Sequence, residues 1–241
     1  MNSEAVTYEA DGLQMVGQLY YEPQFEGRRP AVLVFPEATG LDEHTKSRAE
    51  RLAGHGYVAL ACDPHGDGRL IPDLHEAIGM IRKLREEPFR IRARANAALA
   101  QLQSRPDVNP TKIAAMGFCF GGTMALELAR SGAKVVGVVG FHSGLATVTP
   151  EDNKNIKGKV LVCIGADDPM VHLEQRTDFQ RQMTEAQVDW QMNVYGGVTH
   201  SFTVSTAAEM GDPVRFRYDA RADARSWSEM RAFFNEIFEA S

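Results

Sequence analysis

Cysteine is scarce in this sequence, and long apolar runs are absent from it. The three cysteines among 241 residues, Cys62, Cys119 and Cys163, are too few for a disulfide framework and show no spacing typical of metal ligands. No stretch approaches the roughly 18 apolar residues of a membrane helix, and the polar start Met1–Glu4 does not resemble a secretion signal. We therefore expect a cytoplasmic protein without a membrane segment, a metal or another cofactor.

The chain also lacks a basic stripe interleaved with aromatic residues, which a nucleic-acid-binding face would need. Its formal net charge of −6 disfavours binding to a polyanion. With 44% hydrophobic and 24% charged residues, the composition is that of a globular protein, and the length suits one domain over residues 1–241. A small molecule is therefore the expected partner, and the oligomeric state does not follow from the sequence.

Short apolar runs alternate with amphipathic stretches along the chain. Six runs rich in Val, Ile and Ala predict strands that are buried on both faces of a parallel sheet. These runs are Ala31–Phe35, Val58–Cys62, Lys112–Met116, Val135–Phe141, Val160–Ile164 and Gln191–Tyr195. Stretches with apolar residues at helical spacing predict helices. They are Thr45–His55, Leu74–Arg85, Arg92–Gln103, Gly121–Ser131, Leu173–Ala186 and Asp223–Phe238.

This alternation predicts an α/β fold with a mostly parallel central sheet and helices on both of its faces. Two runs at the start of the chain, Val6–Ala10 and Leu13–Tyr20, flank Asp11-Gly12 and predict an antiparallel hairpin at one edge of the sheet. The charge-rich stretch Lys83–Arg94 is predicted to be a solvated helix–turn–helix surface, because runs of charge are usually exposed.

The strongest functional signal is the segment Gly117-Phe118-Cys119-Phe120-Gly121-Gly122 between a predicted strand and a predicted helix. It has the pattern of a nucleophile elbow, with cysteine in place of serine. Side chains two residues before and two after the nucleophile would collide in so tight a turn, which explains the glycines there. The positive end of the following helix favours the Cys119 thiolate, and the N–H of Phe120 is expected to stabilise an oxyanion.

The alternative is that Cys119 is a buried packing residue in a glycine-rich contact. A nucleotide-binding loop is excluded, since no Lys-Ser or Lys-Thr follows the glycines. Cys62 and Cys163 lie inside apolar runs, so both are predicted to be core residues.

An acid and a histidine follow the nucleophile in the chain order that this turn predicts. Asp168 lies just beyond the strand that ends at Ile164, where catalytic groups collect in open sheets. Its spacing favours it over Asp167, which stays open as the alternative acid. His200 follows the last strand, and we expect it to accept the Cys119 proton or stabilise the thiolate while the acid fixes its tautomer.

The exit of the first central strand, Pro36-Glu37-Ala38-Thr39-Gly40, is where α/β-hydrolases place a second oxyanion donor. The N–H of Ala38 is the expected donor. The Glu37 carboxylate would repel a thiolate, yet it could also accept a proton from a neutral thiol. Four further residues near these motifs are candidates for lining the pocket: His65, Phe118, Phe202 and His142. For His142, a structural role is the alternative.

Glu37, Cys119 in Gly-Phe-Cys-Phe-Gly-Gly, Asp168 and His200-Ser-Phe together resemble the dienelactone hydrolase (carboxymethylenebutenolidase-like) family. The resemblance runs from about Asp11 to the final helix. It implies an α/β-hydrolase fold and a Cys-Asp-His triad that acts on esters or lactones, with a thioester acyl-enzyme as the expected intermediate. It also implies that Glu37 keeps the resting thiol protonated and takes its proton when substrate binds.

The sequence departs from this family in its arginines. Members that open dienelactone hold the substrate carboxylate with arginines, one of them shortly after the catalytic histidine. Here Val204 stands four residues after His200, no arginine follows until Arg215, and only the stretch Arg82–Arg94 could supply another. A general carboxylesterase without dienelactone activity therefore remains an alternative, as does a non-catalytic ligand-binding protein on the same fold. A thiol oxidoreductase or peroxide sensor would lack a resolving cysteine.

Overall fold

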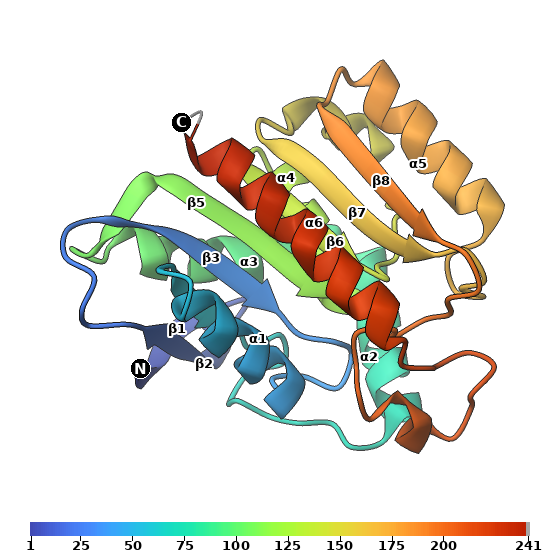
Figure 1. Ribbon diagram of the computed structural model, residues 1–241, viewed down its shortest axis with the longest axis horizontal. Coiled ribbons are helices and arrows are strands. Elements are labelled where there is room, and N and C mark those ends of the chain that lie inside the picture. Colours follow the sequence, from blue (N-terminus) through green and yellow to red (C-terminus); the bar gives the residue numbers. More distant parts are fainter. Residues whose placement is uncertain (240–241) are drawn as a thin grey trace.

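The computed structural model describes residues 1–239 and, within them, one eight-stranded sheet in the order β1-β2-β4-β3-β5-β6-β7-β8 (Figure 1). The strands are β1 (Asn2–Ala10), β2 (Leu13–Tyr21), β3 (Arg29–Phe35), β4 (Val58–Ala61), β5 (Val108–Phe118), β6 (Gly137–Phe141), β7 (Lys159–Gly165) and β8 (Trp190–Tyr195). The α-helices are α1 (Glu43–Ala53), α2 (Leu74–Glu86), α3 (Pro88–Gln103), α4 (Phe120–Arg130), α5 (Leu173–Glu185) and α6 (Ala220–Glu239). Two short 3-10 helices are η1 (Pro150–Asn155) and η2 (Ala207–Met210).

Strands β3 to β8 pair in parallel, and β1 and β2 form an antiparallel hairpin at one edge. Burial on both faces explains why most central strands read as continuous apolar runs. The hairpin turns at Asp11 and Gly12, which both have positive φ. The predicted α/β-hydrolase fold, with its mostly parallel sheet and edge hairpin, is therefore confirmed.

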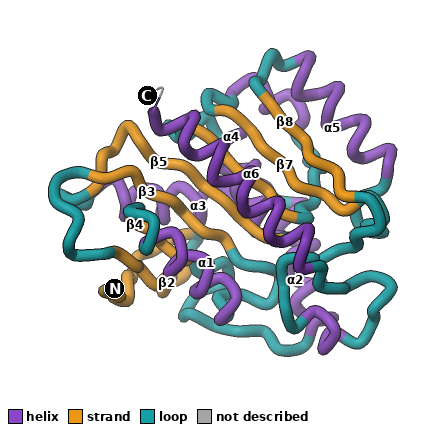
Figure 2. The backbone as a smooth tube through the Cα atoms, viewed as in Figure 1, coloured by secondary structure: helices purple, strands orange, loops and turns teal. Residues whose placement is uncertain are grey.

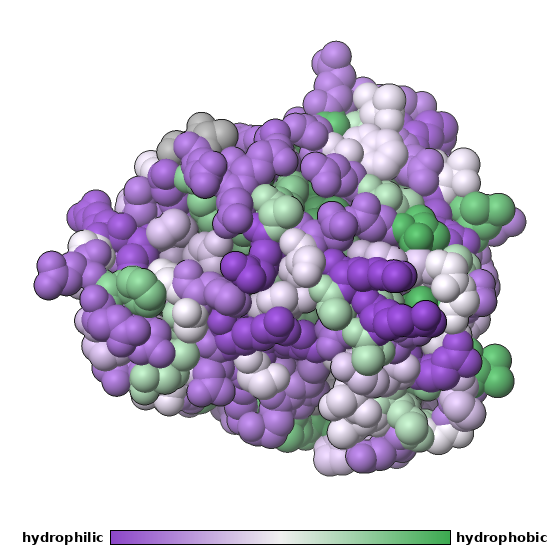
Figure 3. Space-filling model, viewed as in Figure 1, coloured by the Kyte–Doolittle hydropathy of each residue, from purple (hydrophilic) through white to green (hydrophobic). Residues whose placement is uncertain are grey.

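Helices cover both faces of the sheet (Figure 2). Helices α1 and α6 lie on one face over a core that contains Phe118, Phe141 and Trp227. On the opposite face, α3, α4 and α5 pack over a core that contains Phe120 and Phe179. The surface on the α6 side is largely hydrophilic, as the amphipathic pattern of a covering helix requires (Figure 3). No helix among residues 1–239 is both long enough and apolar enough to cross a membrane.

The prediction of a solvated surface for the stretch Lys83–Arg94 was wrong at several of its arginines. Arg94 is only 5% exposed, and its Nη2 lies 2.6 Å from Asp11 Oδ2 in the hairpin turn. The Arg92 guanidinium lies between Glu127 of α4 and Asp152 of η1, at 2.8 and 2.6 Å. A charge run can be buried in this way when each charge meets a partner from a distant part of the chain.

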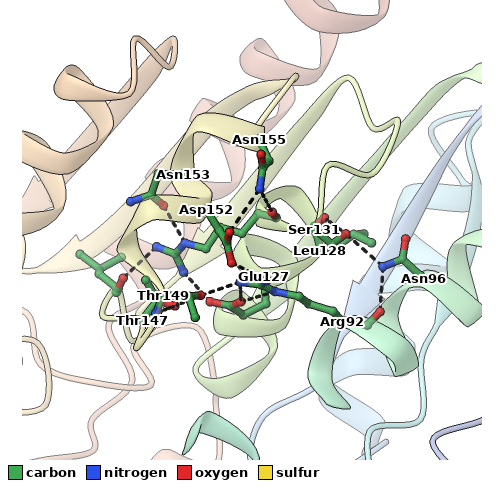
Figure 4. A network of polar contacts seen from close by, with 12 residues as sticks. Arg92, Asn96, Glu127, Leu128, Ser131, Thr147, Thr149, Asp152, Asn153 and Asn155 are labelled. Atoms are coloured by element: carbon green, nitrogen blue, oxygen red, sulfur yellow. Dashed lines mark hydrogen bonds and ion pairs between the residues drawn. The ribbon is translucent and has the colours of Figure 1, made fainter. Parts of the chain in front are cut away.

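The two ion pairs of Arg92 belong to a polar network that fixes the loop after β6 (Figure 4). Arg130 and Glu127, both buried on α4, lie 2.9 Å apart, and Arg130 Nε donates to Asn153 Oδ1 at 2.8 Å. Arg130 Nη2 also donates to the carbonyl of Leu145 at 3.2 Å. The network therefore ties the helix that begins at Phe120 to the loop that follows β6.

Candidate active site

Cys119 occupies a strained turn between β5 and α4. Its φ of 51° and ψ of −112° place a side-chain-bearing residue in a region that few residues other than glycine adopt. The backbone N–H of Cys119 donates to the carbonyl of Phe141 at 2.9 Å, which holds the turn against β6. The side chain is 8% exposed and lies at the N-terminus of α4, where the helix dipole favours negative charge.

The glycines on either side of Cys119 allow its neighbours to approach. A Cβ atom at Gly117 would overlap the backbone of Gly121, and one at Gly121 would overlap the backbone of Phe35 at the end of β3. The tight turn therefore depends on glycine at both positions, for the steric reason that the motif predicts.

Asp168 and His200 meet above the carboxyl ends of β7 and β8. His200 Nδ1 lies 2.7 Å from Asp168 Oδ2, and the N–H of Met170 donates to the other carboxylate oxygen at 2.8 Å. Asp168 and His200 are only 3% and 2% exposed, whereas Asp167 points to solvent. Only Asp168 of the two candidate acids thus contacts the histidine.

His200 is held by its backbone as well as by its side chain. Its N–H donates to the carbonyl of Arg215, and its carbonyl accepts from the N–H of Arg217. Burial by itself would lower the pKa of the imidazole, but the adjacent Cys119 and the Asp168 carboxylate outweigh it and raise the pKa to about 10. His200 Nε2 is buried, and apart from the neighbouring Cys119 side chain it has no hydrogen-bond partner among the described residues, so it remains available for the reacting groups.

Glu37 and Ala38, from the loop after β3, line the same cavity as Cys119 and His200. Burial raises the pKa of the Glu37 carboxyl to about 7, even though His200 opposes the shift. Its Oε1 atom is buried without a hydrogen-bond partner among the described residues and lies 3.7 Å from His142 Nε2. Such a group can change its protonation state near neutral pH.

Two backbone N–H groups at the site are free of protein acceptors. Phe120 is the first residue of α4, and the first N–H groups of a helix have no intrahelical acceptor. Neither its N–H nor that of Ala38 donates to another residue within the described range 1–239. Both groups therefore remain available to a ligand.

The cavity over Cys119 is small, about 110 Å³, and mostly apolar. Its apolar wall comes from α2, the loop before α5 and the segment after His200: Leu74, Ile78, Ile81, Val171, Met210 and Phe216. Arg85 brings a guanidinium into this wall, where it donates to Thr123 Oγ1 at 3.4 Å and lies over the Phe120 ring. No carboxylate among residues 1–239 forms an ion pair with Arg85.

Arg85 belongs to the stretch Arg82–Arg94, which the family resemblance names as a possible source of a substrate-binding arginine but which the charge pattern assigns to the solvated surface. The signal that reveals it is its position in α2. Leu74, Ile78, Ile81 and Arg85 follow one another at four, three and four residues and so share one face of the helix. An arginine on an apolar stripe is therefore better interpreted as a cavity residue than as a surface residue.

The four residues predicted to line the pocket lie behind the cavity instead. Phe118 precedes Cys119 in the chain, so its side chain points to the opposite face of the sheet, where it stacks on Phe141. His142 is fully buried between Phe202 and His200, with its Nε2 atom 2.8 Å from Thr203 Oγ1. Three of the four thus form a layer that supports His200.

His65, the remaining one, is also buried behind the site. Its Nε2 atom lies 2.7 Å from the carbonyl of Ala38. It therefore holds the loop that carries the Ala38 N–H without lining the cavity itself.

The fold and the order of the site residues define an α/β hydrolase, and sequence comparison gives its family. Residues 16–238 match the model of the dienelactone hydrolase family, so the chain belongs to that family and is an ester or lactone hydrolase. A Synechocystis protein named provisionally as a carboxymethylenebutenolidase is 28% identical over 243 residues, covering 95% of this chain and 94% of the relative. A Bradyrhizobium protein named provisionally as a 2-oxo-3-(5-oxofuran-2-ylidene)propanoate lactonase is 30% identical over 75% of this chain and 76% of its own.

Two solved structures resemble the chain over nearly its whole length. One, named m3DLH, has 45% sequence identity and a TM-score of 0.95, and 98% of each chain is covered. The other is a dienelactone hydrolase-like promiscuous phosphotriesterase from metagenomic libraries, with 41% identity, a TM-score of 0.94 and 98% coverage of each chain. The predicted family membership and enzyme class are thereby confirmed.

Proposed function

We propose that the protein hydrolyses small esters or lactones with a Cys119-His200-Asp168 triad and a thioester acyl-enzyme intermediate. The observation that carries this proposal is the buried 2.7 Å contact between His200 Nδ1 and Asp168 Oδ2, with Cys119 on the strained turn beside the imidazole. A nucleophile, a base and an orienting acid in contact are the requirements for covalent catalysis.

In the acylation step, the Cys119 sulfur attacks the carbonyl carbon and forms the thioester as the bond from carbon to the leaving oxygen breaks. Protonated His200 donates its proton from Nε2 to that oxygen, which leaves as an alcohol or, in a lactone, stays attached as a hydroxyl group. The raised pKa of His200 keeps the imidazole protonated before this step. Asp168 orients the ring and stabilises its positive charge.

In the deacylation step, a water molecule gives a proton to neutral His200 and attacks the thioester carbon. The carbon–sulfur bond then breaks, releasing the carboxylic acid and the Cys119 thiolate. In both steps the carbonyl oxygen becomes negatively charged, and the N–H groups of Phe120 and Ala38 are suited to stabilise it.

Glu37 is proposed to exchange one proton with Cys119. It takes the thiol proton as substrate enters and returns it when the thiolate is released, so that no net proton is gained or lost. A pKa of about 7 supports this role, because a carboxyl group at its ordinary pKa would be a far weaker proton acceptor.

The cavity supports a substrate with an apolar body and one negatively charged end. Arg85 contributes a cation to an apolar wall and has no ion-pair partner among the described residues. An unpaired guanidinium in such a wall favours a carboxylate, which it can bind through two hydrogen bonds. We therefore propose that esters or lactones carrying a carboxylate are preferred over neutral ones.

A panel of neutral and carboxylate-bearing esters and lactones tests both the reaction and the role of Arg85. We expect the wild-type enzyme to hydrolyse both classes and to favour the carboxylate class. Replacing Arg85 by glutamine should lower kcat/KM for that class by about 10- to 100-fold, since a hydrogen bond to a charged group contributes about 1.5–3 kcal/mol. The neutral class should change by less than about threefold, because it makes no use of the charge.

Arg82→Gln is the matched control, because Arg82 lies on the same helix but is exposed. It should leave both classes unchanged. An equal loss on neutral and anionic substrates in Arg85→Gln would contradict carboxylate recognition, and absence of turnover by the wild-type enzyme on every member of the panel would contradict the proposed reaction.

Hydrolysis of phosphotriesters is a second candidate activity. The relative with 41% identity over 98% of this chain is named as a promiscuous phosphotriesterase. Here the Cys119 thiol and Ala38 line one cavity, and a backbone N–H donor at such a site can also stabilise a phosphoryl oxygen. Diethyl p-nitrophenyl phosphate added to the panel measures this activity, and release of p-nitrophenol at the rate given by Cys119→Ala protein would exclude it.

A further inference from the structure

A second cavity, of about 420 Å³, lies against the small cavity over Cys119 and shares two lining residues with it, Ala146 and Gln175. The outer cavity lies between α5 and the loop after β6. Apolar surface from Leu145 and Phe179 forms one part of it, and Glu174 and Asp178 of α5 form another. The cavity over Cys119 is smaller than most ligand sites, so a long substrate needs further space.

The wall between the two cavities depends on one long side chain. Ala146 contributes only a methyl group, whereas Gln175 extends from α5 to the loop and its Oε1 accepts the N–H of Leu145 at 3.2 Å. Gln175 is half-buried. Its amide therefore closes the space between helix and loop.

The loop is also held from its other side, independently of Gln175. The Arg130 guanidinium donates to the carbonyl of Leu145, and Thr123 Oγ1 donates to the carbonyl of Gly144 at 3.0 Å. A shortened side chain at position 175 should therefore leave the loop in place and open the wall.

We propose that Gln175 determines the longest substrate that the enzyme accepts by separating the catalytic cavity from the outer cavity. Removing its amide joins the two cavities and admits an extended group. That group is uncharged, because Glu174 and Asp178 would repel a second carboxylate. This inference rests on the proposed hydrolysis at Cys119 and specifies the range of its substrates.

The test compares kcat/KM for two series of neutral esters, one lengthened in the acyl group from acetate to octanoate and one in the alcohol from methyl to octyl. In Gln175→Ala, the ratio of the longest to the shortest substrate should rise at least about tenfold in one series, since each added methylene in an apolar pocket changes kcat/KM by about 10-fold or more. The series that responds identifies the part of the substrate that enters the outer cavity. Turnover of the shortest ester should stay within about threefold of wild type.

Gln175→Met separates the size of the side chain at position 175 from its hydrogen bond to Leu145, because methionine fills similar space without the amide. It should keep the wild-type ratio, as should Glu174→Ala, which changes the outer cavity alone. An unchanged ratio in both series for Gln175→Ala, with normal turnover of the shortest ester, would overturn the inference and leave the proposed reaction intact. Absence of ester turnover in the wild-type enzyme would overturn both the inference about Gln175 and the proposed reaction.

Discussion

Cys119→Ala is expected to lower kcat for the best ester or lactone by about 10⁴- to 10⁶-fold, with the protein still folded. Removing the nucleophile eliminates the covalent route and leaves only the residual effect of the oxyanion donors and substrate binding. Alanine fits the turn no worse than cysteine does, since both carry a Cβ atom at the same positive φ. The measurement is steady-state hydrolysis beside a thermal unfolding curve for each protein.

Two companion variants make the Cys119 result specific. Cys119→Ser keeps an attacking group between the same partners, so its kcat should lie between those of wild type and Cys119→Ala. Cys62→Ala removes a different buried thiol that lies outside the cavity, and it should retain kcat within about threefold. Full turnover by folded Cys119→Ala would show that the reaction uses another group.

Asp168→Asn is expected to lower kcat by about 10³- to 10⁴-fold. An asparagine amide can donate to His200 Nδ1, and this favours the neutral tautomer that carries its proton on Nε2. In that tautomer Nε2 cannot accept a proton from water. The geometry around the side chain should persist, because the substituted amide keeps an oxygen for the N–H of Met170. The pH dependence of kcat should shift as well, since the neighbour that helps to raise the His200 pKa loses its charge.

Asp167→Asn is the matched control for Asp168→Asn. It makes the same chemical change at the adjacent residue, but Asp167 is exposed and makes no contact with His200. Its kcat should stay within about threefold of wild type. A larger loss in Asp167→Asn than in Asp168→Asn would assign the acid to the other aspartate.

The fold was largely predictable because strands that are buried on both faces appear in the sequence as continuous apolar runs. Boundaries were less predictable. The helix expected from Arg92 begins at Pro88, since proline suits the first turn of a helix, and the strand expected from Lys112 begins at Val108. The glycine-rich turn at Cys119 was predictable because its tight geometry constrains the sequence locally. The contact between Asp168 and His200 was predictable because both follow the carboxyl ends of neighbouring parallel strands.

The surroundings of the site were less predictable because they depend on packing between distant segments. Phe118 and Phe202 lie within two residues of Cys119 and His200 in the chain, yet they belong to the core on the opposite face of the sheet. The alternation of side chains in a strand could have excluded Phe118. The apolar stripe on α2 could have indicated Arg85, whereas Gln175 reaches the cavity from a helix whose placement no local pattern specifies.

The most direct measurement of the central claim is the site of acylation. The enzyme would be mixed with excess p-nitrophenyl acetate, quenched in acid within the first turnovers, digested and analysed by mass spectrometry. The account predicts one acetyl group per chain on the peptide that contains Cys119. Hydroxylamine should remove this group, as it removes a thioester. In Asp168→Asn, the acetylated form should accumulate if deacylation slows more than acylation. Acetylation of another residue, or turnover with no acetyl group on Cys119 at any quench time, would contradict it.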